Sequence, residues 1–361
     1  MKIRRFFLPV LSFVFIAGLG INGLAQEENA DDAWLSPLTL QANKTGRILY
    51  MAEYAAQKIA AMDVQTEQIL YEIVLPDSPA GLALSPDETQ LYVSGASPSG
   101  KIYVIDLPSR KIVQSIWVGH SPCAMTVGDD GKTLYVCNRF SYDVSICSLQ
   151  TGKETARIPV PREPVAAVLT QDGRYLFVIN HLHTMRASED YAAAQASVID
   201  LREQRVVKNI RLLNGSVDLQ DICLSPDGRY AYVVHVLARY QLPTTQLERG
   251  WINTNALSIL DVENQTHYAS VLLDSVDLGA ANPWSVRCTK DGKYLCVTIA
   301  GAHELQVIDR AALHEKLTKA ALREEQAKKS SAFVMNTAND LSFMAGIRKR
   351  ISLQGKGPRG L

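Results

Sequence analysis

The chain has 361 residues, of which 47% are hydrophobic and 20% charged, and its formal net charge is zero. This composition can bury a large core. Because phosphate backbones are bound through a positive field, a neutral chain is not expected to bind nucleic acid as a general partner.

Residues 1–25 have the pattern of a secretory signal peptide. MKIRR supplies positive charge, FFLPVLSFVFIAGLG is apolar, and Gly23-Leu24-Ala25 is a cleavage site of the small-x-small type. The alternative is a membrane anchor, but the apolar run is short for a full span and contains Pro9. We therefore expect export to the periplasm or the cell exterior, a linker over residues 26–34, and no stable membrane span after signal removal.

From Leu35 onward one pattern recurs, an acidic turn followed by an aromatic and β-branched strand. The copies are NKTGRILYMA (Asn43–Ala52, degenerate), SPDETQLYVS (Ser85–Ser94), GDDGKTLYVC (Gly128–Cys137), TQDGRYLFVI (Thr170–Ile179), SPDGRYAYVV (Ser225–Val234) and TKDGKYLCVT (Thr289–Thr298). A repeat of about 40 to 45 residues is typical of a four-stranded propeller blade. The sequence therefore predicts an all-β fold, a β-propeller, over residues 35–361.

Each copy predicts four strands, a to d. Strand a follows an X-Pro pair, an Asp-Gly hairpin leads to strand b, strand c ends in Asp, and strand d follows a polar turn. Six blades are recognisable, over residues 35–76, 77–119, 120–161, 162–214, 215–274 and 281–354.

The last blade is interrupted after Asp309 by a segment rich in Ala, Leu, Glu and Lys, which predicts a helical insertion over about 311–338. The final residues, Gly357–Leu361, match the start of strand a in Ser78–Leu82. We interpret them as the first strand of a truncated seventh blade, whereas the alternative is that they close a six-bladed ring.

In such a blade the b–c and d–a links share one rim of the ring, and these links vary between copies. Two of them are long, Asn180–Gln195 and His235–Asn255. Because function concentrates in variable loops on a fixed scaffold, this rim is the predicted ligand- or partner-binding face. Its candidate residues are His120, Arg139, Asn180, His181, His183, His235, Arg239, Tyr240, Arg249, Trp251, Trp284 and His303.

Three histidines on this rim, His181, His183 and His235, are a candidate metal site, because imidazole is a common ligand of transition metals. The competing interpretation is that loop residues are polar anyway and that the repeat places them on one rim. His267 and His314 are expected to be merely exposed. No catalytic residue can be named, since the chain has no G-x-S-x-G, H-E-x-x-H, P-loop or dinucleotide motif.

The Asp that ends strand c recurs, at Asp63, Asp106, Asp200, Asp261 and Asp309. Repetition in nearly every blade indicates a turn or cap device rather than a catalytic array. The six cysteines form no C-x-x-C pair and lie in apolar strands, so they are interpreted as small buried side chains. Since export permits disulfides, Cys123 and Cys137, on strands expected to be neighbours, are the candidate pair.

The strand b pattern of Tyr135-Val136-Cys137-Asn138, with its variants in the other copies, resembles the YVTN-type β-propeller repeat. The resemblance covers nearly all of the chain after the signal and implies an extracytoplasmic, seven-bladed surface or periplasmic binding protein. The strings at Arg239–Asp261 and Asn339–Leu361 resemble a bacterial subgroup in which the propeller is joined to a downstream c-type cytochrome. The chain has no C-x-x-C-H, so a c-type haem would have to lie beyond Leu361.

Two functions follow from these observations. We favour a binding or scaffold module that binds a small-molecule ligand or a protein redox partner on its loop rim, as the propeller part of a longer electron-transfer protein. The alternative is a periplasmic enzyme, a lactonase-like hydrolase or an oxidoreductase component, with a histidine-based metal ion on the same rim. No other cofactor is expected within the chain.

Overall fold

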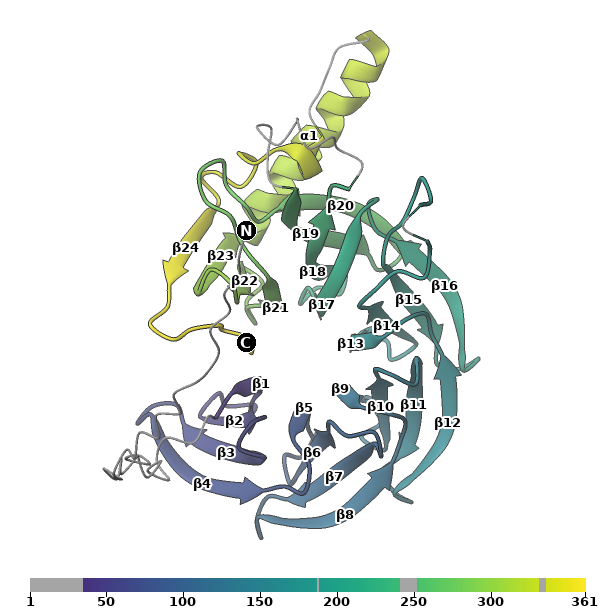
Figure 1. The fold of residues 1–361 in the computed structure, drawn as a ribbon, viewed down its shortest axis with the longest axis vertical. Coiled ribbons are helices and arrows are strands. Elements are labelled where there is room, and N and C mark those ends of the chain that lie inside the picture. The colour runs from purple at the N-terminus through teal and green to yellow at the C-terminus, as the bar shows by residue number, and fades with distance from the viewer. Residues whose placement is uncertain (1–34, 187, 241–251, 331–335) are drawn as a thin grey trace, which may run out of the picture. The chain divides into compact units, whose positions relative to one another are not determined.

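A computed structural model describes residues 35–186, 188–240, 252–330 and 336–361. Within these ranges the fold consists of six antiparallel sheets, each formed by four strands that are consecutive in the chain. The sheets surround a common centre with their first strands innermost (Figure 1). The predicted β-propeller of four-stranded blades is confirmed, and the blades are numbered 1 to 6 in chain order.

The strands of each kind occupy the same place in every blade. The inner strands are β1 (Pro37–Ala42), β5 (Pro79–Leu84), β9 (Pro122–Val127), β13 (Pro164–Leu169), β17 (Ser216–Leu224) and β21 (Pro283–Cys288). The second strands are β2 (Ile48–Glu53), β6 (Gln90–Gly95), β10 (Thr133–Asn138), β14 (Tyr175–Asn180), β18 (Tyr230–Ala238) and β22 (Tyr294–Ile299). The third strands are β3 (Lys58–Asp63), β7 (Lys101–Asp106), β11 (Asp143–Ser148), β15 (Gln195–Asp200), β19 (Asn253–Asp261) and β23 (Glu304–Asp309). The outer strands are β4 (Gln68–Val74), β8 (Lys111–Trp117), β12 (Lys153–Pro159), β16 (Arg205–Arg211), β20 (Thr266–Leu272) and β24 (Arg348–Ser352).

This order gives the ring two faces. The turns between first and second strands and between third and fourth strands lie on one side, here called the turn face. The links between second and third strands, and from each outer strand to the next inner strand, lie on the other side, here called the loop face. The Asp at the end of strand c belongs to the turn face, where Asp63 accepts backbone N–H bonds from Gln65 and Thr66. The predicted turn role of this repeated carboxylate is confirmed.

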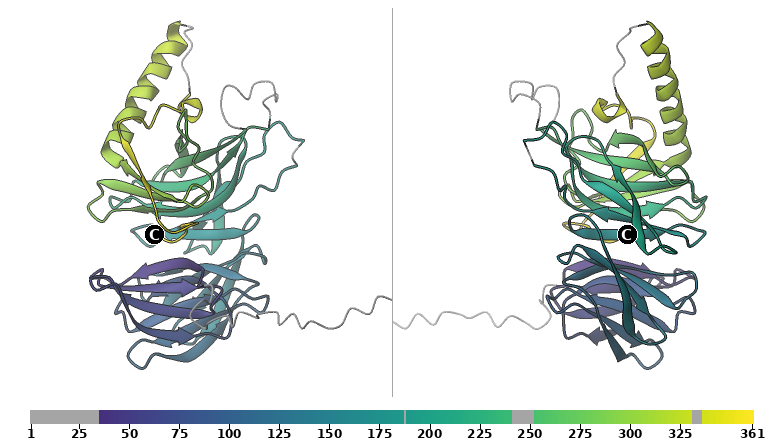
Figure 2. Two further views of the ribbon diagram at one scale, coloured as in Figure 1. Left: turned by 60° about the vertical axis from the view of Figure 1, so that its left-hand side comes forward. Right: turned by 90° about the vertical axis from the view of Figure 1, so that its right-hand side faces the viewer.

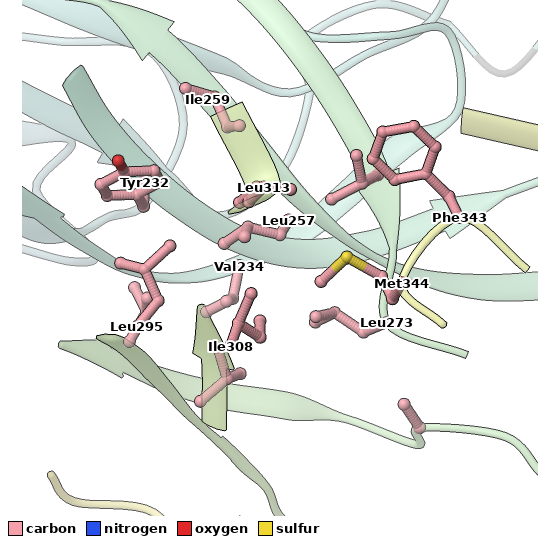
Figure 3. Close-up of a cluster of buried hydrophobic side chains, with 14 of the residues drawn as sticks. Tyr232, Val234, Leu257, Ile259, Leu273, Leu295, Ile308, Leu313, Phe343 and Met344 are labelled. Carbon is pink, nitrogen blue, oxygen red and sulfur yellow. The ribbon is translucent and has the colours of Figure 1, made fainter. Parts of the chain in front are cut away.

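Neighbouring blades bury apolar side chains between their sheets. Between blades 4 and 5, Phe177 and Ile179 pack with Val233 and Leu219, and all four are fully buried. Between blades 5 and 6, a larger cluster also includes Leu313 and Met344 from the insertion (Figure 3). Because each apolar face is covered by the next blade, the ring is the unit of stability.

The insertion in blade 6 begins with α1 (Arg310–Ser330) and includes a short 3-10 helix, η3 (Thr337–Asn339). Asp309 starts α1 by accepting the backbone N–H of Ala312 at 2.9 Å. The first turns of the helix pack on the sheets, whereas its far end projects away from them (Figures 1 and 2). The predicted helical insertion is confirmed, and no described helix is both long and apolar enough to cross a membrane.

Two histidines expected to be exposed are instead packed against side chains near this insertion. His314 of α1 accepts or donates a hydrogen bond at 2.8 Å to the hydroxyl of Tyr232, and its ring lies 4.3 Å from that of Tyr230. Burial lowers the pKa of His314 to about 4. His267 lies 2.8 Å from the hydroxyl of Ser270. The expectation was wrong because it ignored the helix that covers this part of blade 5.

The segment after β24 returns to the centre of the ring (Figure 1). The carbonyl of Arg359 accepts a hydrogen bond from Thr298 at 3.1 Å, and a Cβ on Gly360 would lie 2.6 Å from Cγ of Leu40 in β1. Gly81, at the matching point of β5, lies equally close to the next inner strand, since its Cβ would meet the carbonyl oxygen of Cys123 at 2.5 Å. Residues 357–361 therefore occupy the place of an inner strand.

Candidate functional site

The loop face is fixed to the inner strands by one repeated hydrogen bond. The carbonyl of the residue before each inner-strand proline accepts the N–H of the first residue in the b–c link, as from Arg139 to Ser121 at 3.1 Å and from His181 to Glu163 at 2.8 Å. Ser121 and Glu163 take left-handed φ values of 52° and 56° to present this carbonyl. The backbone thus sets where the link side chains begin, and the sequence of each link decides what they do.

Arg139 and Trp284, both predicted site residues, line the same cavity at the centre of the ring. The cavity has a volume of about 400 Å³ and is walled by the six inner strands. Arg139 donates to Oε2 of Glu163 from Nε at 3.1 Å and from one terminal nitrogen at 3.0 Å. The ring of Trp284 lies 4.6 Å from the guanidinium of Arg359.

His120 belongs to a small aromatic group beside Arg139. Its Nδ1 lies 2.9 Å from the hydroxyl of Ser121, and its ring meets Phe140 edge-on at 5.4 Å. Arg139 also lies over the Phe140 ring, at 5.2 Å. The structure therefore brings His120 and Arg139 together through an exposed phenylalanine that the sequence analysis did not single out.

His181 and His183 lie on the long link of blade 4, each bonded locally. Nδ1 of His181 lies 2.9 Å from the carbonyl oxygen of Leu219, and its Nε2 lies 3.2 Å from Oδ1 of Asp218. Nδ1 of His183 lies 2.9 Å from the carbonyl oxygen of Met185. His181 thus connects the link of blade 4 to β17, the inner strand of blade 5, and it is not joined to His183.

Two predicted site residues are part of the protein interior. His235 is fully buried, with Nε2 at 2.7 Å from the Ser258 hydroxyl and Nδ1 at 3.0 Å from the Val236 carbonyl oxygen. The burial lowers the pKa of His235 to about 4, so the ring is neutral at pH 7. Asn180 is also fully buried and donates to the Gln195 carbonyl and the Ser197 hydroxyl. The prediction that they bind a ligand on the rim is wrong, because their side chains point into the sheets.

Of the remaining predicted residues, two form contacts within the protein and two lie outside the described residues. Arg239 is held by the insertion, since it donates to the Ala338 carbonyl at 2.7 Å and to the Asn339 side chain at 2.5 Å. Nδ1 of the exposed His303 accepts the N–H of Gly357 at 3.0 Å. Arg249 and Trp251 lie outside the described residues. Arg239 and His303 therefore position neighbouring segments.

The proposed metal ligands do not form a site. Both nitrogens of His235 have partners in the protein, and no group of three or more His, Cys, Asp or Glu within the described ranges could hold a metal ion. The metal prediction failed because residues that share a rim in sequence register can still point in different directions.

The disulfide prediction is also contradicted, because all six cysteines are free. The thiol of Cys123 approaches the backbone carbonyls of Cys137 and Pro164 instead, at 3.5 and 3.3 Å. Burial raises the pKa of the Cys123 thiol to about 12. The register explains the failure, since Cys137 faces Ala124 rather than Cys123 across the β9–β10 pair.

Sequence reasoning missed three charged residues that line the central cavity. Arg287 and Asp221 stand on neighbouring inner strands and are joined at 2.5 Å, while Oδ2 of Asp221 also accepts from Ser285 and from the N–H of Val286. Arg359 is the third. A signal was present, because Arg287 is the one charged residue of its strand and Arg359 stands where the matching copy has Ala80.

Exposed aromatic side chains gather on the loop face. Of the eight exposed aromatic residues within the described ranges, six lie in or at the end of its links. These six are Tyr54, Trp117, Phe140, Tyr142, Tyr191 and Tyr240. The other two, Tyr268 and Tyr294, lie on strands near the turn face. This face therefore differs from the opposite one in chemistry as well as in loop length.

No protein-family model matches the chain. Over 147 residues, 40% of its length, the chain is 28% identical to hydrazine synthase subunit beta of Kuenenia stuttgartiensis, of which the match covers 36%. Over 196 residues, 52% of its length, it is 23% identical to antigen Lp49 of Leptospira interrogans, of which the match covers 42%. The matches thus span less than half of each curated relative.

A solved structure titled hydrazine synthase, also from Kuenenia stuttgartiensis, aligns with a TM-score of 0.80 at 22% identity. The alignment covers 94% of this chain and 92% of the other. At this level of identity the similarity establishes the fold, and it supports the six-bladed arrangement of four-stranded sheets independently of the repeats.

Proposed function

We propose that this protein is an exported binding module, without catalytic activity of its own, that docks a protein partner on its loop face. The observation that carries the proposal is the concentration of exposed aromatic side chains there, at six of eight described positions. Aromatic residues and arginine are enriched at protein interfaces. Aromatic side chains in particular bury much surface at low entropic cost.

Phe140 is the centre of this proposed interface. It is exposed, has the guanidinium of Arg139 over its ring and is buttressed by His120. Tyr142, four-tenths exposed, lies two residues further along the same link. An aromatic anchor held by a rigid neighbour loses little freedom on binding, which favours affinity.

The relatives support a role within an assembly. One of them is named as a subunit of hydrazine synthase, so a propeller of similar fold there belongs to a larger enzyme. We propose by analogy that the present chain acts beside a catalytic protein, and that the partner is a redox protein. We also propose that the chain is a propeller of the YVTN type, that it is exported by its N-terminal signal, and that it is part of a longer protein that carries a c-type haem.

The competing hypothesis of a metal enzyme required His235 as a metal ligand, and the structure does not support that role. A ligand must offer a free nitrogen to the metal, and both nitrogens of His235 are engaged inside blade 5. His181 and His183 alone supply two imidazoles with separate backbone partners. No observation on the described residues favours that function.

Site-specific photo-crosslinking in the native host tests the docking proposal. A photoreactive phenylalanine analogue at Phe140 or Tyr142 should crosslink to one common protein, whereas the analogue at Tyr268 or Tyr294 should not. The affinity of the purified partner should then fall at least tenfold for the double variant F140A/Y142A, since each aromatic anchor contributes about 1 kcal/mol or more.

The matched control is Y268A, an exposed tyrosine away from the loop face. Its affinity for the partner should equal that of the wild type. Crosslinking that is as efficient at Tyr268 and Tyr294 as at Phe140, or an unchanged affinity of F140A/Y142A, would overturn the proposal. Measured turnover of a substrate by the purified chain would contradict the non-catalytic part.

A further inference from the structure

The cavity at the centre of the ring has more positive than negative side chains. Arg139, Arg287 and Arg359 all line it, and Asp221 is the one carboxylate side chain among its lining residues. The remaining wall is mostly apolar, formed by short stretches such as residues 38–40 and 165–168. A cavity of about 400 Å³ has the size of a small-molecule binding site.

Two of the three guanidinium groups keep donors for another acceptor. Arg139 donates from Nε and one terminal nitrogen to a single oxygen of Glu163, and its second terminal nitrogen bonds no other described residue. Arg287 uses only one terminal nitrogen, which reaches Asp221 and the Val286 carbonyl. Because a guanidinium has five N–H donors, each retains capacity for a ligand oxygen.

Arg359 carries the excess charge. Its guanidinium lies over the Trp284 ring at 4.6 Å, and no carboxylate within the described ranges forms an ion pair with it. Arg139 and Arg287 each have a carboxylate side chain as partner, whereas Arg359 pairs with no described carboxylate side chain and stands beside apolar walls. Such walls focus an electrostatic field into the cavity they enclose.

From this arrangement we propose that the central cavity binds a small multivalent oxyanion, a molecule bearing two or more carboxylate or phosphate groups. Forked guanidinium donors match the geometry of these groups and bind them with charge-assisted hydrogen bonds. One group of the anion faces Arg359 and Trp284, and a second group takes remaining donors of Arg139 or Arg287. This site lies in the central cavity rather than on the exposed aromatic side chains of the loop face, and Arg139 is the one residue that contacts both.

Calorimetric titration of the full chain tests the proposal with two probes, citrate for carboxylates and inorganic pyrophosphate for phosphates. The buffer contains no oxyanion, and sodium chloride holds the ionic strength constant. At least one probe should bind saturably with one site per chain, and the tighter probe identifies the chemistry of the group. Binding should quench or shift the fluorescence of Trp284, a response that W284F should lose.

Arg359→Gln is the first variant, because Arg359 has no ion pair within the described residues and its loss leaves no buried carboxylate unpaired. It should weaken binding at least tenfold, and R139Q should weaken it as well. The control R205Q removes an exposed arginine paired with Glu203 on the turn face and should bind as the wild type. F140A should also retain anion affinity, which separates this site from partner docking.

Absence of saturable binding of both probes would overturn the proposal. So would an R359Q variant with wild-type affinity, or an equal loss of affinity in R205Q. Failure of F140A/Y142A to affect a protein partner would leave the anion site untouched, because that experiment addresses a different surface.

Discussion

The two faces of the ring use their polar residues differently. On the turn face, one hydrogen-bonded unit recurs between the first and second strands: in blade 4 the hydroxyl of Thr170 donates to Asp172 at 2.5 Å, and the N–H of Arg174 donates to the same oxygen at 3.1 Å. Hydroxyl bonds from Ser85, Thr170 and Thr289, followed by backbone bonds, lower the pKa values of Asp87, Asp172 and Asp291.

On the loop face each link is different. The link of blade 3 presents Phe140 and Tyr142 to solvent, that of blade 4 joins His181 to Asp218, and that of blade 5 anchors the insertion through Arg239. The comparison teaches that a carboxylate repeated in nearly every blade stabilises the scaffold, whereas residues present in one blade are the ones available for binding.

The largest loss of stability is expected from a substitution at Gly100, at the end of a loop-face link. This residue belongs to the scaffold although it lies on the loop face. A Cβ there would lie 1.6 Å from the carbonyl oxygen of Gly119, in the next link. The two backbones approach because the N–H of Val118 donates to Gly100 at 3.0 Å. G100A should therefore lower the free energy of unfolding by about 3 kcal/mol in urea denaturation, since backbone must move apart.

Gly355→Ala is the control, because no atom lies within 4 Å of its added Cβ. This change should alter the unfolding free energy by less than about 0.5 kcal/mol. If G100A were as stable as G355A, the close packing between the two links would be refuted, and the loop face would be less rigid than we infer.

A second effect, somewhat smaller, is expected from acidification. The pKa of His235 falls from 6.5 in the unfolded chain to about 4 in the folded one through burial, next to His267, whose pKa burial also lowers. The folded state favours the neutral ring, so its contribution is complete above pH 6.5 and is lost as the pH falls towards 4. Stability should drop by about 2 kcal/mol from this group between pH 7.5 and 5.

The variant H235N isolates this contribution, because Asn138 and Asn180 occupy the matching position in blades 3 and 4. Denaturation at several pH values should show a weaker loss of stability on acidification in H235N than in the wild type. Parallel profiles for H235N and the wild type would show that His235 does not remain neutral in the folded state.

The fold was predictable because each blade is specified locally. An Asp-Gly turn, a strand of β-branched and aromatic residues and a closing Asp give a hairpin without information from the rest of the chain. Repetition then requires the sheets to cover one another. The helix α1 was equally visible, since its composition departs from that of every strand around it.

The site was only partly predictable, because the direction of a side chain depends on register. The continuous apolar run of β14 could have corrected one error: Asn180 ends this strand, and every residue from Leu176 to Asn180 is fully buried, so both sides of the strand face the interior. Arg239 could not have been assigned in this way, because its partners come from residues 338 and 339. Arg287 and Arg359 come together only when the ring is formed.

The smallest loss of stability is expected from an Asp→Ala substitution, which can be made on each face and compared. Asp172→Ala removes the acceptor of the Thr170 hydroxyl and of the Arg174 N–H, and should lower the unfolding free energy by about 1 kcal/mol at pH 7, the usual value for lost hydrogen bonds. Asp277→Ala, at an exposed position in a loop-face link, should change it by less than about 0.5 kcal/mol.

Acid sharpens this comparison, because the pKa of Asp172 lies below its usual value in the folded chain. The carboxylate stabilises the fold above the unfolded pKa of 3.8, and that contribution is lost as the pH falls through the lower folded value. The difference between D172A and the wild type should therefore shrink at pH 3 in urea denaturation. An equal loss of unfolding free energy for D172A and D277A at pH 7 would mean that the repeated turn-face carboxylate stabilises the fold no more than a loop-face carboxylate that occurs once. The proposed division of roles between the two faces would then be wrong.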